Sequence, residues 1–134
     1  MINTVVNMPS AFYGDSITAA LEQTGNFRVR NLSQSAPMAV EAAIRETDAD
    51  ILLMGVSVVS GFTLAAREKI SRRTRIAFPR CKIVLLVDER VSEAQTAGVK
   101  ALAQVRLADD FLYASGSMDY LVAKLETIYD YMSQ

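Results

Sequence analysis

The chain alternates between short apolar segments of strand length and longer segments with helical periodicity, and this alternation limits the folds open to it. The strand-like segments at 51–56 and 82–87 are apolar along nearly their whole length, which is typical of strands covered on both faces. The segment at 27–32 instead alternates apolar and polar residues. In all, the pattern predicts five strands, at 2–8, 27–32, 51–56, 82–87 and 110–114.

A segment with helical periodicity follows each predicted strand, at 11–24, 38–47, 62–78, 91–105 and 117–132. Repeated strand–helix units form parallel sheets with right-handed crossovers and with helices on both faces. We therefore predict a flavodoxin-like α/β fold, a three-layer sandwich around a five-stranded parallel sheet in the order 2-1-3-4-5. At 134 residues, the chain is expected to form one domain over 1–134.

The composition excludes several classes of function. The chain has no histidine and a single cysteine, Cys81, so histidine-based catalysis and a cysteine metal cluster are both excluded. We expect no catalytic residues, no metal site and no cofactor. No apolar run approaches the roughly 20 residues of a membrane span, and the first residues lack the features of a signal peptide. These features predict a cytoplasmic protein without membrane contact.

Ligands of parallel α/β sheets bind at the carboxyl ends of the strands. In this chain that edge is predicted to hold Asn7, Gly55, Val87 and Ala114. None of these side chains offers a carboxylate, a hydroxyl group or an amine.

Three segments resemble the receiver domains of response regulators. Residues 49–56 (ADILLMGV) resemble the third strand of a receiver with its lead-in, and residues 78–86 (FPRCKIVLL) resemble the passage into the fourth. Residues 108–114 (ADDFLYA) are similar to the family's A-D-G-Y-L-L-K. By the order and spacing of elements, the resemblance covers nearly the whole chain. It implies a regulatory module of two-component signal transduction, either standing alone or preceding a helix-turn-helix domain of a transcription regulator.

The resemblance also shows which receiver residues are missing. Receivers hold Mg²⁺ with an acidic pair after strand 1, accept the phosphoryl group on an aspartate after strand 3, and use a hydroxyl residue and a lysine after strands 4 and 5. In this chain the corresponding positions are Asn7 and Met8, Gly55, Val87 and Ala114. Phosphoryl transfer needs a divalent ion and polar groups around the transferred charge, so phosphorylation at this place is excluded. We expect a non-enzymatic pseudo-receiver held in one conformation.

In receivers the face formed by helix 4, strand 5 and helix 5 mediates dimerisation or output contacts. The resemblance therefore implies a partner or homodimer face that contains Phe111, Tyr113 and Tyr120. Aromatic residues in a last strand and helix are also often core residues, and both interpretations remain open here.

The segment 67–82 holds seven of the fourteen basic residues. Its residues Arg67, Lys69, Arg72, Arg73 and Arg75 form a candidate basic patch for nucleic acid, an anionic ligand or an acidic protein. A solvated helix face is the favoured interpretation, because no aromatic residues are interleaved. Nucleic acid is expected only through an additional C-terminal domain.

An alternative function of a different class is a flavodoxin-like module that binds a small molecule or a nucleotide in the emptied pocket at the carboxyl edge. A glycine-rich phosphate loop would favour it, and the sequence contains none.

Overall fold

The computed structural model describes residues 1–33, 37–88, 97–98, 100–101 and 107–132. Its strands form one sheet in the order β2-β1-β3-β4-β5, and every neighbouring pair is parallel, as predicted. The strands are β1 (Ile2–Asn7), β2 (Phe27–Asn31), β3 (Ile51–Val56), β4 (Lys82–Val87) and β5 (Asp110–Tyr113). The helices are α1 (Ala11–Gln23), α2 (Pro37–Thr47), α3 (Leu64–Ala77) and α5 (Met118–Met132). The predicted helix at 91–105 lies largely outside the described residues.

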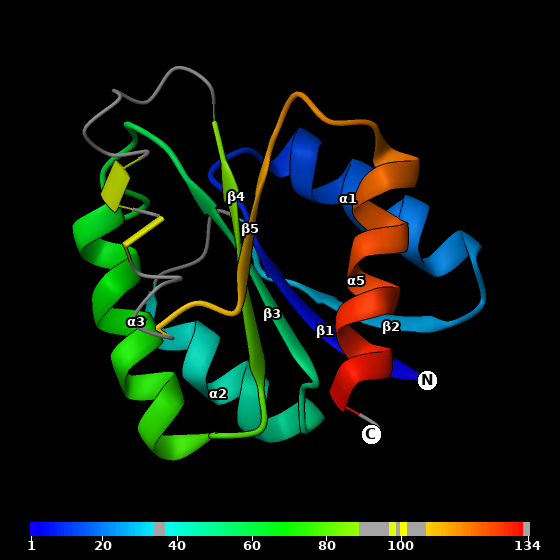
Figure 1. The fold of residues 1–134 in the computed structure, drawn as a ribbon, viewed down its shortest axis with the longest axis horizontal. Coiled ribbons are helices and arrows are strands. Elements are labelled where there is room, and N and C mark those ends of the chain that lie inside the picture. The colour runs from blue at the N-terminus through cyan, green and yellow to red at the C-terminus, as the bar shows by residue number, and fades with distance from the viewer. Residues whose placement is uncertain (34–36, 89–96, 99, 102–106, 133–134) are drawn as a thin grey trace.

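The helices form two layers, one on each face of the sheet (Figure 1). Helices α1 and α5 cover one face, where Ile17 and Leu21 of α1 pack with Leu121 and Leu125 of α5. Helices α2 and α3 lie on the other face, and Val40 and Ile44 of α2 belong to the core there. Within the described part of the chain, no helix is long and apolar enough to cross a membrane.

Burial along the strands explains their sequence patterns. All of β3 is buried, and only the first residue of β4 is partly exposed, because these central strands are covered on both faces. Strand β2 lies at the edge of the sheet and alternates between buried and more exposed residues. After α1, Gly25 adopts φ +77°, which suits the predicted helix C′ position, and its N–H group donates to the Glu22 carbonyl.

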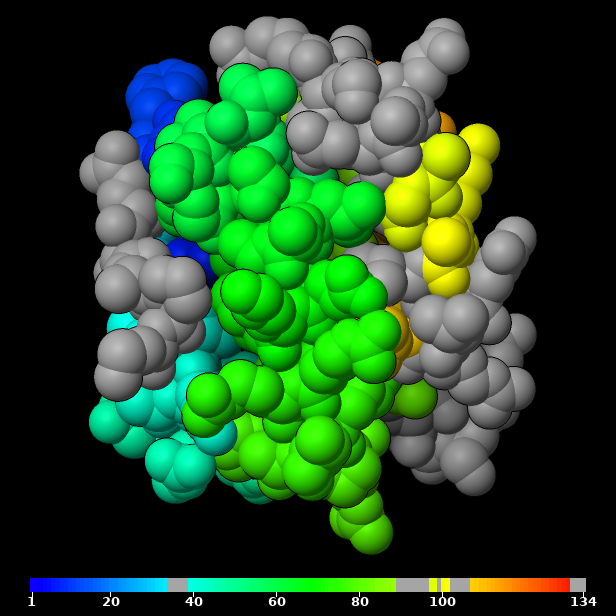
Figure 2. Space-filling model, turned by 90° about the vertical axis from the view of Figure 1, so that its left-hand side faces the viewer, coloured from blue at the N-terminus to red at the C-terminus, as the bar shows by residue number. Residues whose placement is uncertain are grey.

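Helix α3 turns a polar stripe toward the sheet. Its buried residues are Arg67, Ser71 and Thr74, at the i, i+4 and i+7 spacing of a single helix face. Figure 2 shows the opposite, outer surface of this helix in green, in front of the sheet. The buried stripe is therefore built from residue types that are usually exposed, and it brings a charged side chain into the interior.

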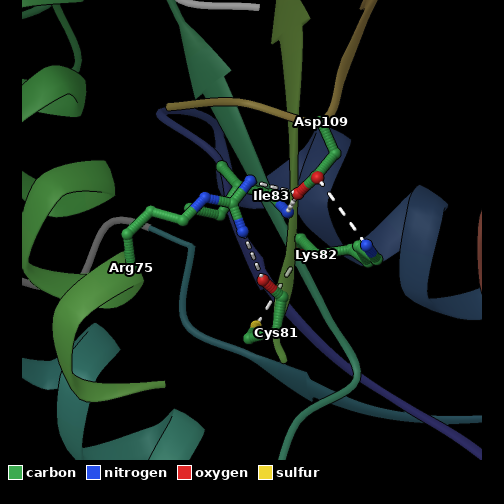
Figure 3. A network of polar contacts seen from close by, with 5 residues as sticks. All are labelled: Arg75, Cys81, Lys82, Ile83 and Asp109. Atoms are coloured by element: carbon green, nitrogen blue, oxygen red, sulfur yellow. Dashed lines mark hydrogen bonds and ion pairs between the residues drawn. The ribbon is translucent and has the colours of Figure 1, made fainter. Parts of the chain in front are cut away.

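A second polar network ties the C-terminal end of α3 to β4 and to the residue before β5 (Figure 3). The Asp109 carboxylate accepts a hydrogen bond from Arg75 and one of 2.7 Å from the Ile83 backbone N–H. Lys82 places its Nζ 3.9 Å from the same carboxylate, and Arg75 also donates to the Cys81 carbonyl at 3.1 Å. Asp109 thus holds three chain segments together through one carboxylate.

Asp109→Asn is expected to lower the free energy of unfolding by about 2 kcal/mol, because a charge-assisted network loses its anion. Urea unfolding followed by circular dichroism measures this change. The control is Glu46→Gln, which removes the exposed Arg30–Glu46 ion pair and is expected to cost less than about 0.5 kcal/mol. Equal losses for the two variants would show that Asp109 is an ordinary surface carboxylate.

Candidate functional site

The predicted edge positions lie on neighbouring strands. Asn7 pairs with Met54, the residue before Gly55, and Val87 pairs with Val56, the residue after it. Just beyond β5, the Ala114 N–H donates to the Val87 carbonyl at 2.8 Å. Parallel strands that end together place their last residues at the same edge of the sheet, so the register brings these positions to one edge.

The guanidinium group of Arg67 reaches this edge from α3 and binds the ends of two strands. Its Nε donates to the Gly55 carbonyl at 2.8 Å, and one terminal nitrogen donates to the Asn7 carbonyl at 2.9 Å. The other terminal nitrogen donates to Asn7 Oδ1 at 2.7 Å. The Asn7 side chain is fixed in turn, because its Nδ2 donates to the Leu32 carbonyl at 2.8 Å. Arg67 thus joins β1, β3 and α3, and it is 0 % exposed.

The loop between β3 and α3 adds an aromatic ring to this arrangement. The Phe62 ring centroid lies 4.4 Å from the Arg67 guanidinium carbon, within the range of a cation–π contact. Two backbone hydrogen bonds shape the loop, from Ser57 N–H to the Phe62 carbonyl and from Phe62 N–H to the Val59 carbonyl, both 2.9 Å. Gly61 adopts φ +86° within this turn, a conformation that favours glycine. This loop conformation therefore places the Phe62 ring against the Arg67 guanidinium.

Burial has an electrostatic cost that these contacts offset. It lowers the pKa of Arg67 from its ordinary 12.5 to about 10, so the side chain remains a cation at neutral pH. Taking an ion out of water costs several kcal/mol unless hydrogen bonds replace its hydration. Three oxygen acceptors and the Phe62 ring provide that replacement.

The other side of Gly55 is closed by Met8 and Pro9. A Cβ atom at position 55 would lie 2.8 Å from Pro9 Cδ, closer than such contacts allow, and 3.0 Å from Met8 Sδ, a tight contact. Met8 is itself buried. The position that the sequence resemblance aligns with the receiver aspartate therefore has little room for a side chain in this packing.

Tyr13 of α1 extends the site toward β5. Its hydroxyl donates to the Ala114 carbonyl at 3.3 Å. Burial, followed by the negative charge of Asp88, raises the pKa of Tyr13, so the phenol remains a neutral donor at physiological pH. The end of β5 is thus connected to α1 by a neutral hydrogen bond.

The residues that the sequence resemblance aligns with the metal and phosphoryl positions at the ends of receiver strands 1 and 3 do not fit a divalent cation. Mg²⁺ requires hard oxygen ligands, usually including carboxylates. Asn7 Oδ1 already accepts from a cation, Met8 offers a thioether, and Gly55 offers no side chain. A guanidinium at 2.7 Å from the remaining amide oxygen would also repel a second cation.

The structure corrects the predicted basic patch at two of its five positions. Arg67 is buried, and Arg75 is turned toward Asp109 with a side chain only 20 % exposed. Lys69, Arg72 and Arg73 are exposed on the outer side of α3. The sequence does carry a signal for the buried arginine, because Arg67 lies on the same helix face as Leu64 and Ser71. That face is hard to recognise because most of its residues are polar.

The residues of the predicted partner face differ in exposure. Tyr113 and Tyr120 are 44 % and 56 % exposed. Phe111 is partly buried against the core on the α2 and α3 side, and its ring meets that of Tyr113 edge-to-face at 5.9 Å. The predicted contribution of helix 4 lies largely outside the described residues.

No protein-family model matches the sequence, and no curated protein is significantly similar to it. Solved structures do resemble it. A DNA-binding response regulator of the LuxR family from Staphylococcus aureus has a TM-score of 0.76 and 12% identity, over 96% of this chain and 99% of that one. A CheY-like receiver domain protein from Methanospirillum hungatei JF-1 has a TM-score of 0.76 and 14% identity, covering 99% and 97%. A two-component response regulator from Clostridium difficile has a TM-score of 0.76 and 16% identity, over 100% of both chains.

These similarities and the strand order define a flavodoxin-like α/β fold. More narrowly, the fold is that of CheY-like receiver domains, which the resemblance of the three sequence segments implied. At this level of identity the likeness concerns the fold, and the roles of individual residues rest on the geometry described above.

Proposed function

We propose that the chain is a receiver-like regulatory module that accepts no phosphoryl group and acts through protein contacts. The observation that carries this proposal is the guanidinium of Arg67 at the carboxyl edge of the sheet, hydrogen-bonded to Asn7 and to the Gly55 carbonyl. A cation of the chain itself thus contacts Asn7 and Gly55, two positions that the sequence resemblance aligns with receiver carboxylates.

The same contacts support a fixed conformation. Receivers change state when the phosphoryl group draws groups at the strand ends toward itself. Here the ends of β1 and β3 are already joined to α3 through one side chain. A ligand can shift a conformational equilibrium only by binding the two states differently. At the ends of β1 and β3, Asn7 Oδ1 already accepts from Arg67 and Gly55 has no side chain, so neither residue offers a free group to such a ligand. Regulation would then come from the presence or absence of the protein and its partner.

The test is to expose the protein to acetyl phosphate, and separately to beryllofluoride, with Mg²⁺. We expect no phosphoryl adduct by mass spectrometry and no shift of the backbone amide signals of Gly55 and Val87 in NMR spectra. A receiver with an intact aspartate provides the positive control. An adduct on any carboxylate at this edge, or amide shifts that depend on beryllofluoride, would contradict the proposal.

The alternative of a small-molecule module predicts a different result. It requires space at the carboxyl edge, whereas Asn7, Met8, Val87 and Arg67 are all buried there. Thermal shift measurements with ATP, flavin mononucleotide and a cyclic dinucleotide distinguish the two functions. We expect an unchanged midpoint with all three, and saturable stabilisation by any of them would favour the alternative.

The partner face proposed from the receiver resemblance includes the exposed Tyr113 and Tyr120. If this face forms a homodimer, Tyr120→Glu is expected to weaken the dimer by about tenfold or more, because a buried tyrosine contact becomes an unpaired charge. Light scattering over a concentration series measures the change. Tyr120→Phe keeps the ring and serves as the control, and a dimer unaffected by Tyr120→Glu would show that this face is not the interface.

A further inference from the structure

The two outer surfaces of the molecule carry opposite charge. Helix α3 has five basic residues and one acidic residue. Helices α1 and α5 together have five acidic residues and one basic residue, Lys124, which pairs with Asp110 at 3.0 Å. The formal net charge of −1 conceals this separation. Because these helices lie on opposite faces of the sheet (Figure 1), one molecule presents both surfaces outward at once.

The basic surface forms a stripe along α3. Lys69, Arg73 and Ile76 are exposed and lie at i, i+4 and i+7, so they share the outer face of the helix, which Figure 2 views directly. Ile76 is 85 % exposed, an unusual position for a large aliphatic side chain. Arg73 pairs with Glu41 at 2.8 Å, but its side chain is 74 % exposed, and an ion pair of this kind is easily exchanged for another.

The acidic surface is a shallow groove between α1 and α5. Three carboxylates of α5 line it, from Asp119, Glu126 and Asp130, and no lysine or arginine is among its described lining residues. Small apolar side chains separate these carboxylates, namely Val122 and Ala123 of α5 and Ala20 of α1. The groove therefore offers negative charge beside small apolar side chains.

The spacing of the two surfaces matches when the helices run antiparallel. Lys69, Arg73 and Ile76 are separated by four and then three residues, and Asp130, Glu126 and Ala123 have the same separations in the reverse direction. At a rise of about 1.5 Å per residue, each cation would face a carboxylate and Ile76 would face Ala123. Helices laid into grooves are anchored in this way, with apolar residues at helical spacing and flanking charges that fix the register.

We propose that α3 of one copy of this protein docks into the α1–α5 groove of a second copy. The contact is heterologous, because the two surfaces differ, so each copy can bind one neighbour through α3 and another through its groove. The assembly grows with protein concentration and weakens with salt, since its charges are solvent-exposed and screened beyond about 10 Å at 0.1 M ionic strength. This contact is separate from the face that contains Tyr113 and Tyr120.

Sedimentation velocity over a concentration series at low salt provides the test. One variant reverses the stripe (Lys69→Glu with Arg73→Glu), and another reverses the groove (Glu126→Lys with Asp130→Lys). Each alone is expected to raise the dissociation constant by about tenfold or more, because like charges then face each other. An equimolar mixture of the two is expected to recover association, since the intact groove of the first fits the intact stripe of the second.

Two further variants serve as controls, and circular dichroism melting checks that every variant is folded. Arg28→Glu with Arg30→Glu makes the same change of charge at the edge strand β2 and is expected to leave association unchanged. Tyr120→Glu affects only association through the face that contains Tyr113 and Tyr120, so the association that remains in this variant is expected to keep its sensitivity to salt and to the two charge reversals. A wild-type protein that stays monomeric at low salt, or a mixture that associates no better than its components, would overturn the proposal. If the protein stays monomeric but binds an acidic peptide or a nucleic acid through the α3 stripe, then the partner of the stripe is that ligand and not a second copy.

Discussion

Arg67→Ala is expected to lower the free energy of unfolding by about 3 kcal/mol or more, the largest loss that we expect from a single substitution in this chain. The change leaves a cavity and removes the donors for Asn7 Oδ1 and for the Asn7 and Gly55 carbonyls. Native proteins are stable by only about 5–15 kcal/mol, so this loss is a large part of the total. Urea unfolding of the wild-type and variant proteins measures it.

A double-mutant cycle separates the hydrogen bonds from simple packing. Arg67→Met keeps much of the side-chain volume, and Asn7→Leu removes the amide that accepts from the guanidinium. If the polar network matters, the double variant should lose less free energy of unfolding than the two single variants together. In the double variant, leucine at position 7 leaves no buried amide oxygen without its donor. Additive losses would show that the arginine is only a space-filling residue. A loss below about 1 kcal/mol for Arg67→Ala would show that its side chain is not buried as described.

Gly55→Asp restores the carboxylate that receivers use, yet we expect it to destabilise the protein by about 1–3 kcal/mol and to give no phosphoryl adduct. The new Cβ would lie within 3.0 Å of both Met8 and Pro9, and Pro9 has a rigid ring that cannot turn aside. The nearby cation does not remove this steric conflict. Thermal unfolding and mass spectrometry after treatment with acetyl phosphate and Mg²⁺ are the measurements.

Gly55→Ala is the matched control, because it adds the Cβ without the charge. We expect it to be destabilised to a similar extent, and Pro9→Ala in the same chain should restore part of the loss by removing the atom at 2.8 Å. A Gly55→Asp protein as stable as the wild type would mean that the edge is open. It would also mean that glycine at this position does not reflect close packing.

The fold could be predicted from the sequence because its signals are local and repeated. The apolar runs at 51–56 and 82–87 coincide with the buried strands β3 and β4. Apart from the helix predicted at 91–105, which lies largely outside the described residues, the other predicted elements begin and end within two residues of the observed ones. The largest differences are in α3, predicted at 62–78 and observed at Leu64–Ala77. There Phe62 belongs to the loop that holds the guanidinium rather than to the helix.

The residues of the carboxyl edge could be predicted, but not what fills the space between them. Strand order alone brings Asn7, Gly55 and Val87 to one edge. Whether that edge is open depends on Arg67, twelve residues after Gly55 on a helix whose apolar and polar faces are not distinct. Five basic residues within nine positions of α3 suggested a solvated surface, and only tertiary packing shows which of them turns inward.

The most direct test of the central claim measures hydrogen exchange of the Arg67 Nε–H group by NMR, with its signal assigned by its absence in Arg67→Lys. The Nε–H donates to the buried Gly55 carbonyl at 2.8 Å, so we expect it to exchange far more slowly than the Nε–H of the exposed Arg72. An Arg67 Nε–H that exchanges as fast as that of Arg72 would contradict the account, because the guanidinium would then lie in solvent.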